Sequence, residues 1–403
     1  MTLYSKPRPD DPNMIVVGVI GAGAMGSGIA QVAAAAGHRV ILGDANAEAV
    51  AKGRALIAKS VARRVEKGLI MSTEADRLLG RISDAGDLST GYSAFGECGL
   101  VIEAVLESLP VKRALFASLE REVRDDCILA TNTSSLSVAA IAGACERAER
   151  VVGIHFFNPA PVMPLVEIVP ALTTSDDVAG ASASLVDGWG KTTVMASDTP
   201  GFIVNRIARP FYSESLRQLE EGIADVATID WAMRELGGFK MGPFELMDLI
   251  GNDVNYAVTQ SVFEAFFYDP RYRPALTQRR LVEAGLFGRK AGRGYYDYRD
   301  GAARPEPTRD LELGHRIVDR TLAMLINAAV DAAHLRVASP RDIETAMLKG
   351  VNYPKGLLAW GDEIGPAVVL SHLTALQAEY GEERYRASPL LRRRVLEGRS
   401  LLV

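Results

Sequence analysis

Short apolar runs alternate with helical patterns in the first half of the chain. The run at residues 14–20 carries no charge and is typical of a strand buried on both faces of a parallel sheet. A glycine-rich turn follows it, and then an alanine-rich helix that we expect to reach about residue 37. Similar runs and spacings predict further strands at 38–44, 100–107, 127–133, 150–157 and 192–198, and helices at 111–123 and 136–144, the last capped by Ser134 or Ser135.

The pattern changes after residue 199, where long helical spacings dominate and β-branched runs become rare. A polar stretch at 299–310 interrupts this helical region and is typical of a linker. The chain is therefore predicted to combine an α/β domain with all-α domains. We place the boundaries at 1–13 for a loose N-terminal extension, 14–198 for the α/β domain, 199–298 for a helical domain, 299–312 for the linker and 313–403 for a second helical domain.

The helical region contains an internal repeat. Residues 205–251 align with residues 319–365 without a gap, at a constant offset of 114 positions. Identical residues recur at this offset, among them Arg206 and Arg320, Gly242 and Gly356, and Asp248 and Asp362. The alternative is a coincidence of apolar spacing between unrelated helices. Because Asp319 stands where the first copy has Asn205, and no α/β domain precedes the second copy, we expect the second copy to be structural.

Composition narrows the class of protein. The 403 residues suggest two or three domains, and 48% apolar with 24% charged residues suits a soluble globular protein. The net charge of −5 gives no support for nucleic-acid binding. Three scattered cysteines fit neither a disulfide framework nor a metal site, which indicates a reducing compartment. Glycines break the uncharged stretch at 14–37, so we expect no membrane span or secretion signal and predict a cytoplasmic protein.

The turn after the first strand has the spacing of a dinucleotide-binding fingerprint. Gly21, Gly23 and Gly26 form GxGxxG between a predicted strand and a predicted helix, and Asp44 ends the next strand. These glycines permit a tight turn, close approach of a pyrophosphate and close packing of the helix on the strand. Asp44 can accept both hydroxyls of an adenosine ribose and would repel a 2′-phosphate, which favours NAD over NADP. A plain turn with a surface aspartate is the alternative to this Rossmann-type doubly wound sheet.

A histidine and a glutamate are candidates for acid–base chemistry. His155 ends a predicted strand, and Glu167 follows twelve residues later. Three prolines keep the intervening segment extended, so the chain can turn back and bring Glu167 beside the imidazole. A carboxylate there fixes the tautomer and favours the protonated ring, which makes a general base for an alcohol proton. A lone histidine is more often a satisfied core or surface residue, so this interpretation depends on the nearby NAD fingerprint.

Two more polar residues are candidates for contacts with a substrate. Ser134 follows the neighbouring predicted strand, and its hydroxyl could bond the reacting oxygen; an N-cap is its alternative role. Asn205 is expected on the first turns of the helical domain, where it would face a cleft if the two domains close on it.

Specific motifs follow one another from residue 14 to about residue 298: GAGAMG, NTSSLS, HFFNP, PLVEI, DTPGFIVNR, GPFELMDLIG and GRKAGRGYYDY. In this order they resemble the L-3-hydroxyacyl-CoA dehydrogenase family. The repeated helical region resembles bacterial members in which that domain is doubled, which extends the likeness to nearly the whole chain. Since the helical domain forms the dimer interface of single-copy relatives, the resemblance implies a monomer with an internal pseudo-dimer or a homo-oligomer.

The resemblance also implies roles for individual residues. The active-site positions are Ser134, His155, Asn158 and Asn205, with Glu167 as the acid paired with the histidine. The cofactor positions are Gly21, Gly23, Ala24, Met25, Gly26, Asp44, Glu107, Lys112 and, least directly, Lys290. The coenzyme A positions are Lys59, Arg63 and Arg64, a basic cluster for which a solvated helical face is the alternative. Two departures stand out: Gly43 replaces a larger apolar residue, which would loosen the adenine pocket, and Pro210 is expected to interrupt the first helix of the helical domain and kink it.

The activity that the resemblance implies is NAD-dependent oxidation of an L-3-hydroxyacyl-CoA to the 3-oxoacyl-CoA, and the reverse. One alternative is an NAD-dependent dehydrogenase of a free hydroxy acid or sugar acid on the same fold. Another is a non-catalytic protein that binds NAD. Acyl length stays open between substrates such as 3-hydroxybutyryl-CoA and 3-hydroxyadipyl-CoA.

Overall fold

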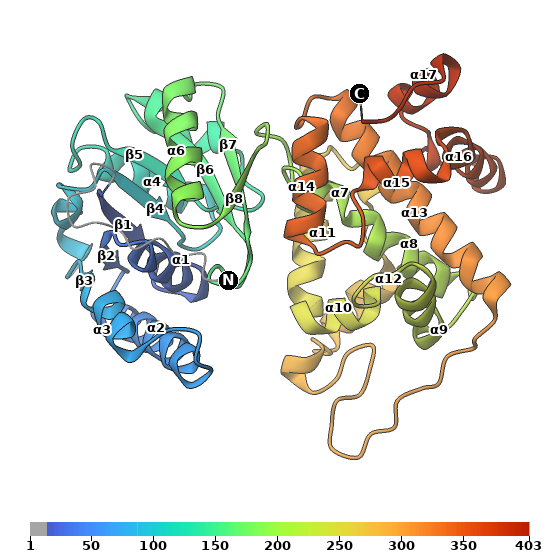
Figure 1. Cartoon of the computed structure of the whole chain (residues 1–403), viewed down its shortest axis with the longest axis horizontal. Coiled ribbons are helices and arrows are strands. Elements are labelled where there is room, and N and C mark those ends of the chain that lie inside the picture. The colour runs from blue at the N-terminus through green and yellow to red at the C-terminus, as the bar shows by residue number, and fades with distance from the viewer. Residues whose placement is uncertain (1–13, 87, 403) are drawn as a thin grey trace. The chain divides into compact units, whose positions relative to one another are not determined.

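The computed structural model describes residues 14–86 and 88–402. The chain divides into a sheet unit, which ends at Thr199, and a helical unit, which begins at Pro200 (Figure 1). The predicted N-terminal extension lies outside the described residues. Among the helices described, none has both the length and the apolar composition needed to span a bilayer.

The described part of the sheet unit contains one eight-stranded sheet in the order β3-β2-β1-β4-β5-β6-β7-β8. Neighbouring strands are parallel except β6 and β7, which are antiparallel. The strands are β1 (Val16–Ile20), β2 (Arg39–Gly43), β3 (Ile82–Asp84), β4 (Leu100–Glu103), β5 (Ile128–Thr131), β6 (Val151–Phe156), β7 (Leu165–Pro170) and β8 (Thr192–Met195). Val17, Ile102 and Ile154 are fully buried, as expected of central strands covered on both faces.

Helices connect these strands. They are α1 (Ala24–Ala35), α2 (Ala47–Glu66), α3 (Ser72–Gly80), α4 (Leu109–Leu119), α5 (Val138–Ala142) and α6 (Asp176–Gly188). The N-cap predicted for α5 was wrong. Ser137 caps this helix by accepting from the Ala140 N–H, whereas Ser134 and Ser135 lie earlier, in the loop after β5.

The predicted fold class is confirmed, and each predicted strand is present in a shorter form. Two strands were missed. β3 has only three residues and pairs at the sheet edge, so it leaves little pattern in the sequence. β7 was expected only as an extended segment, but it hydrogen-bonds to β6 along five residue pairs. This pairing reverses the chain direction within an otherwise parallel sheet.

The helical unit contains α7 (Val204–Ile207), α8 (Arg209–Glu220), α9 (Val226–Trp231), α10 (Pro243–Ile250), α11 (Asn252–Ala265), α12 (Leu276–Glu283), α13 (Leu311–His334), α14 (Pro340–Gly350), α15 (Leu357–Ile364), α16 (Pro366–Tyr380) and α17 (Pro389–Glu397). Pro210 lies beside an interruption of the first helix, as expected, because α7 ends at Ile207 and α8 begins at Arg209. It lies in the first turn of α8, after α7 has ended, where a proline costs no hydrogen bond. At the same offset the second copy has one long helix, α13.

The internal repeat preserves a helix cap made by a carboxylate side chain. Asp230 accepts hydrogen bonds of 2.9 and 3.0 Å from the backbone N–H groups of Phe244 and Glu245 at the start of α10. Glu344, 114 positions after Asp230, does the same for the first turn of α15. The two copies are therefore structurally equivalent, and the repeat is not a coincidence of apolar spacing.

The glycine that precedes each of these two helices recurs for a steric reason. A Cβ atom at Gly242 would overlap the Asp230 carboxylate, and one at Gly356 would overlap the Glu344 carboxylate. Only glycine leaves room for the capping side chain to reach the helix end. The carboxylate and the glycine therefore act as one unit in both copies.

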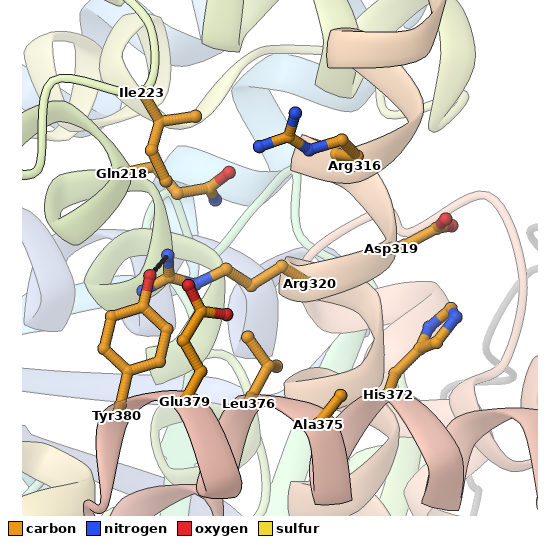
Figure 2. A pocket seen from close by; sticks show the side chains of 10 residues that line it. All are labelled: Gln218, Ile223, Arg316, Asp319, Arg320, His372, Ala375, Leu376, Glu379 and Tyr380. Atoms are coloured by element: carbon orange, nitrogen blue, oxygen red, sulfur yellow. Dashed lines mark hydrogen bonds between the residues drawn. The ribbon is translucent and has the colours of Figure 1, made fainter.

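The copies differ where the first carries Asn205. In the second copy Asp319 occupies this position and borders a pocket of about 270 Å³ between α13 and α16, closed by the end of α8. Figure 2 shows Arg320 on α13 reaching Tyr380 on α16, with Arg316 and Asp319 beside it. Arg320 also bonds Glu221, so its charge is compensated. The second copy thus has a different set of polar groups at the position of the predicted substrate contact.

The polar stretch predicted as a linker lies against the first copy. Between residues 301 and 310 it has no helix or strand. Arg304 bonds Glu245 at 2.5 Å, and the Thr308 N–H donates to the Thr228 hydroxyl at 2.9 Å. These contacts fix a segment whose composition alone indicates flexibility.

We predict that Gly242→Ala lowers the free energy of unfolding by about 2–4 kcal/mol, because the methyl group displaces Asp230 and leaves buried polar groups unpaired. Urea denaturation of the purified chain measures this change. Gly180→Ala is the matched control: Gly180 lies in α6 with nothing within 4 Å of the added carbon, so its effect should be neutral or slightly stabilising. Equal stability of Gly242→Ala and the parent would contradict this account of the repeat.

Candidate active site

The glycine turn between β1 and α1 has the geometry that a pyrophosphate requires. Gly21 has φ +107° and donates from its N–H to the carbonyl of Gly43 at 2.8 Å. A Cβ atom at Gly26 would overlap the carbonyl oxygen of Gly21, so both positions require glycine. Nothing lies within 4 Å of a Cβ atom at Gly23, so the backbone is open to a ligand there. The N-terminus of α1 points its free N–H groups into this space.

Asp44 follows β2 directly and is tied to the same turn. Its Oδ2 accepts from the Ala22 N–H and its Oδ1 from the Ala45 N–H, both at 2.6 Å. The residue is half-buried, and its bond to Ala22 attaches it to the turn next to Gly23. This arrangement fits an acid that receives ribose hydroxyls.

The space beside Gly43 is occupied by side chains from elsewhere in the sheet unit. A Cβ atom there would lie 2.8 Å from the Leu88 side chain and 3.0 Å from that of Phe95. These larger side chains fill the space that a side chain at position 43 would occupy, and a looser adenine pocket stays a prediction.

His155 and Glu167 face each other across the antiparallel pair β6 and β7. They are partners in the strand register, and His155 Nδ1 lies 2.6 Å from Glu167 Oε2. Glu167 is fully buried and His155 is 5% exposed. The ring of Phe157 packs against the imidazole with centroids 4.6 Å apart. Because Nδ1 is committed to the carboxylate, Nε2 is the ring nitrogen that can serve a substrate.

Ser134 lies in the loop after β5, the strand beside β6. Its backbone N–H donates to Glu107 Oε1 at 3.0 Å, so two predicted site residues are in contact. Asn158 is exposed in the loop after β6. Asn132, which the sequence analysis missed, accepts from the Phe156 N–H at 2.8 Å and joins the ends of β5 and β6.

Lys112, a predicted cofactor contact, is buried and pairs with two carboxylates. Its Nζ lies 2.6 Å from Glu103 and 3.2 Å from Glu107, and its side chain is 1% exposed. Burial alone would raise the pKa of Glu107, but Lys112 and the hydrogen bonds from Thr133 and Ser134 outweigh it and lower the pKa. Lys112 is therefore the buried ion-pair partner of Glu103 and Glu107, and its contact with the cofactor stays a prediction. Glu103 was missed, although an acid inside an apolar strand was the available signal.

Asn205 and Lys290 belong to the helical unit. Asn205 lies on α7 and is half-buried, while Lys290 pairs with Asp253 at 2.7 Å. Their contacts with the substrate and the cofactor stay predictions.

The three basic residues predicted to contact coenzyme A lie on α2 and differ in their exposure. Lys59 and Arg63 are exposed, whereas Arg64 borders a pocket of about 210 Å³ together with Lys191. Lys191 was missed by the sequence analysis. Burial, and then the charge of Arg64, lower the pKa of Lys191 to about 8. Two cations at one pocket favour an anionic ligand.

Family models match both units. The NAD binding domain of 3-hydroxyacyl-CoA dehydrogenase matches residues 16–199, and the C-terminal domain of the same enzyme matches residues 201–298 and 317–400. The chain belongs to the 3-hydroxyacyl-CoA dehydrogenase family. It is accordingly an NAD-dependent oxidoreductase of 3-hydroxyacyl-CoA, which confirms the predicted activity and cofactor.

Individual relatives cover most of the chain. It is 41% identical to the 3-hydroxyadipyl-CoA dehydrogenase of Escherichia coli K12, over 95% of this chain and 98% of the relative. The crystal structure of 3-hydroxybutyryl-CoA dehydrogenase from Escherichia coli K12 superposes with a TM-score of 0.88 and 39% identity, covering 95% of this chain and 98% of that one. The human mitochondrial hydroxyacyl-coenzyme A dehydrogenase is 38% identical over 70% of this chain and 91% of its own.

Proposed function

We propose that His155 is the general base in the oxidation of L-3-hydroxyacyl-CoA and that Glu167 supports it. The observation that carries this proposal is the 2.6 Å hydrogen bond between these two buried side chains near the end of β6. β1 and β6 run in the same direction in the sheet, so their carboxyl ends share one edge. Ligands of open α/β sheets bind at that edge, where the glycine turn also lies.

The proposed reaction follows from the two nitrogens of the imidazole. Bound NAD supplies the acceptor for the hydride that leaves C3 of the substrate. His155 takes the proton of the 3-hydroxyl on Nε2, and the Glu167 carboxylate stabilises the imidazolium that forms. Ser134 donates a hydrogen bond to the reacting oxygen. Asn158 and Asn205 orient the substrate.

The cofactor contacts are proposed at three places in the sheet unit. Backbone N–H groups of residues 23–26, including Ala24 and Met25, hold the pyrophosphate at the start of α1, since the N–H groups of Gly21 and Ala22 donate to Gly43 and Asp44. Asp44 accepts the hydroxyls of the adenosine ribose. Glu107 contacts the cofactor with Lys112 as its buried support. Lys290 is a further proposed contact and would have to share its charge with Asp253.

The pocket beside Arg64 is proposed to take a phosphate of coenzyme A. Lys191 Nζ already donates to the backbone carbonyls of Ala160 and Met163, at 2.5 and 2.8 Å, which fixes its position. A phosphate between Lys191 and Arg64 would favour the charged form of Lys191, whose pKa is lowered by burial and then by the charge of Arg64. Lys59 and Arg63 do not border this pocket. They would attract the phosphate groups of coenzyme A over a longer range.

The second helical copy is proposed to act as an internal partner of the first. Buried hydrogen bonds join the copies: Gln218 donates to Thr321 and Arg320 donates to Glu214, both at 3.1 Å. Such contacts give the first copy the partner that a second chain would otherwise supply. We therefore expect a monomer by light scattering, and unfolding or self-association once residues 313–403 are deleted. A fully active, monomeric deletion variant would contradict this proposal.

We predict that His155→Ala lowers kcat by about 10²–10⁴, the usual contribution of a general base. Glu167→Gln should cost less, and the acidic limb of the pH–rate profile should move because the charge that stabilises the imidazolium is lost. Both are measured from the absorbance of NADH with 3-hydroxybutyryl-CoA and 3-hydroxyadipyl-CoA, which also compares the two acyl groups. His315→Ala, on the exposed face of α13, is the control. Near-parental turnover by His155→Ala would remove His155 from the mechanism.

We predict that KM for the acyl-CoA rises as the pH passes about 8, because Lys191 then loses the charge that attracts the phosphate. Below that pH the lysine is protonated and the contribution is fully present. Lys191→Met should have a raised KM without this dependence, whereas exposed Lys59→Met should keep it. Identical KM profiles for Lys191→Met and the parent would exclude this site.

A further inference from the structure

A buried ion pair lies beneath the candidate site. Glu103, the last residue of β4, is fully buried, and Lys112 of α4 is 1% exposed. Glu103 also accepts from the Val105 N–H at 2.7 Å and from the Thr131 hydroxyl at 2.8 Å. A buried charge pair is tolerated only when its hydrogen bonds are satisfied. The proposed reaction does not use Glu103, so its role has to lie elsewhere.

Lys112 connects this pair to a second carboxylate. Its Nζ lies 3.2 Å from Glu107 Oε2, and Glu107 is 36% exposed at its side chain. The other oxygen, Oε1, accepts from the Thr133 hydroxyl at 2.6 Å, the Ser134 N–H at 3.0 Å and the Ser135 hydroxyl at 3.1 Å. One oxygen of Glu107 thus faces the buried lysine, and the other holds the loop that carries Ser134.

The same loop is fixed from its far side. The Thr133 hydroxyl accepts from the Leu136 N–H at 2.9 Å while it donates to Glu107. Asn132 accepts from the Phe156 N–H, next to His155 in β6. Hydrogen bonds therefore join the Ser134 loop to Glu107, and join the preceding residue Asn132 to Glu103 and to the end of the strand that carries the histidine.

We propose that Glu107 is a positioning residue for Ser134, and that the Glu103–Lys112 ion pair holds Glu107 in the orientation this requires. The inference rests on the proposed function, in which the Ser134 hydroxyl bonds the reacting oxygen. A serine displaced by a fraction of an ångström still lets the thioester bind but no longer meets the transition state. Loss of this support should therefore lower kcat more than it raises KM.

Thr133 offers the cleanest test, because it touches Glu107 and is assigned no contact with substrate or cofactor. Thr133→Val removes the hydroxyl at nearly constant volume, and Thr133→Ser retains it. We expect Thr133→Val to lower kcat about 10-fold, with little change in KM for the acyl-CoA or in the Kd for NADH measured by fluorescence. Thr133→Ser should restore most of the lost turnover.

The decisive measurement is a double-mutant cycle with Ser134→Ala. If Thr133 and Glu107 act through the serine hydroxyl, Thr133→Val should cost little in the Ser134→Ala background. A full 10-fold loss in that background would overturn the proposal, since the threonine would then act independently of the serine. Parental kcat for Thr133→Val would also overturn it. Parental kcat for Ser134→Ala, by contrast, would remove the serine from the proposed reaction itself.

Discussion

The hydrogen bond between His155 and Glu167 depends on the register of two antiparallel strands. Side chains alternate between the faces of a sheet, so a shift of one residue between β6 and β7 would send Glu167 to the opposite face. A buried carboxylate without a partner is costly, and so is a buried protonated imidazole. The pairing of the side chains and the pairing of the strands therefore stabilise each other. The one reversal of direction in this sheet occurs where the acid–base pair forms.

Features of the candidate site could be predicted from the sequence where the residues that determine them are close together in the chain. The glycine turn, Asp44 and the prolines between His155 and Glu167 each act locally, and their consequences could be predicted. Glu103 was missed although it is an acid within an apolar strand, and Asn132 was missed because its partner Phe156 comes from another strand. The packing of Phe95 near Gly43 was missed because it too depends on residues that are distant in the sequence. Lys191 gave no signal because its surroundings, and not its neighbours in sequence, lower its pKa.

The two helical copies show which features the fold itself requires. The carboxylates of Asp230 and Glu344, and the glycines that make room for them, recur in both copies. So does an arginine over an aromatic ring, Arg206 over Phe266 and Arg320 over Tyr380. Asn205 does not recur. The residues held in common cap helices or compensate buried charge, whereas the residue proposed to meet substrate was free to change once only one copy was needed for it.

The length of α13 has a consequence for how the helical unit unfolds. At about 1.5 Å per residue this helix is roughly 36 Å long, and it packs against α8 of the first copy as well as α15, α16 and α17 of the second (Figure 1). If α13 unfolded, the apolar surfaces that it covers in both copies would be exposed to water at the same time. The duplicated region should consequently melt as a single cooperative block, with no populated intermediate in which one copy survives without the other.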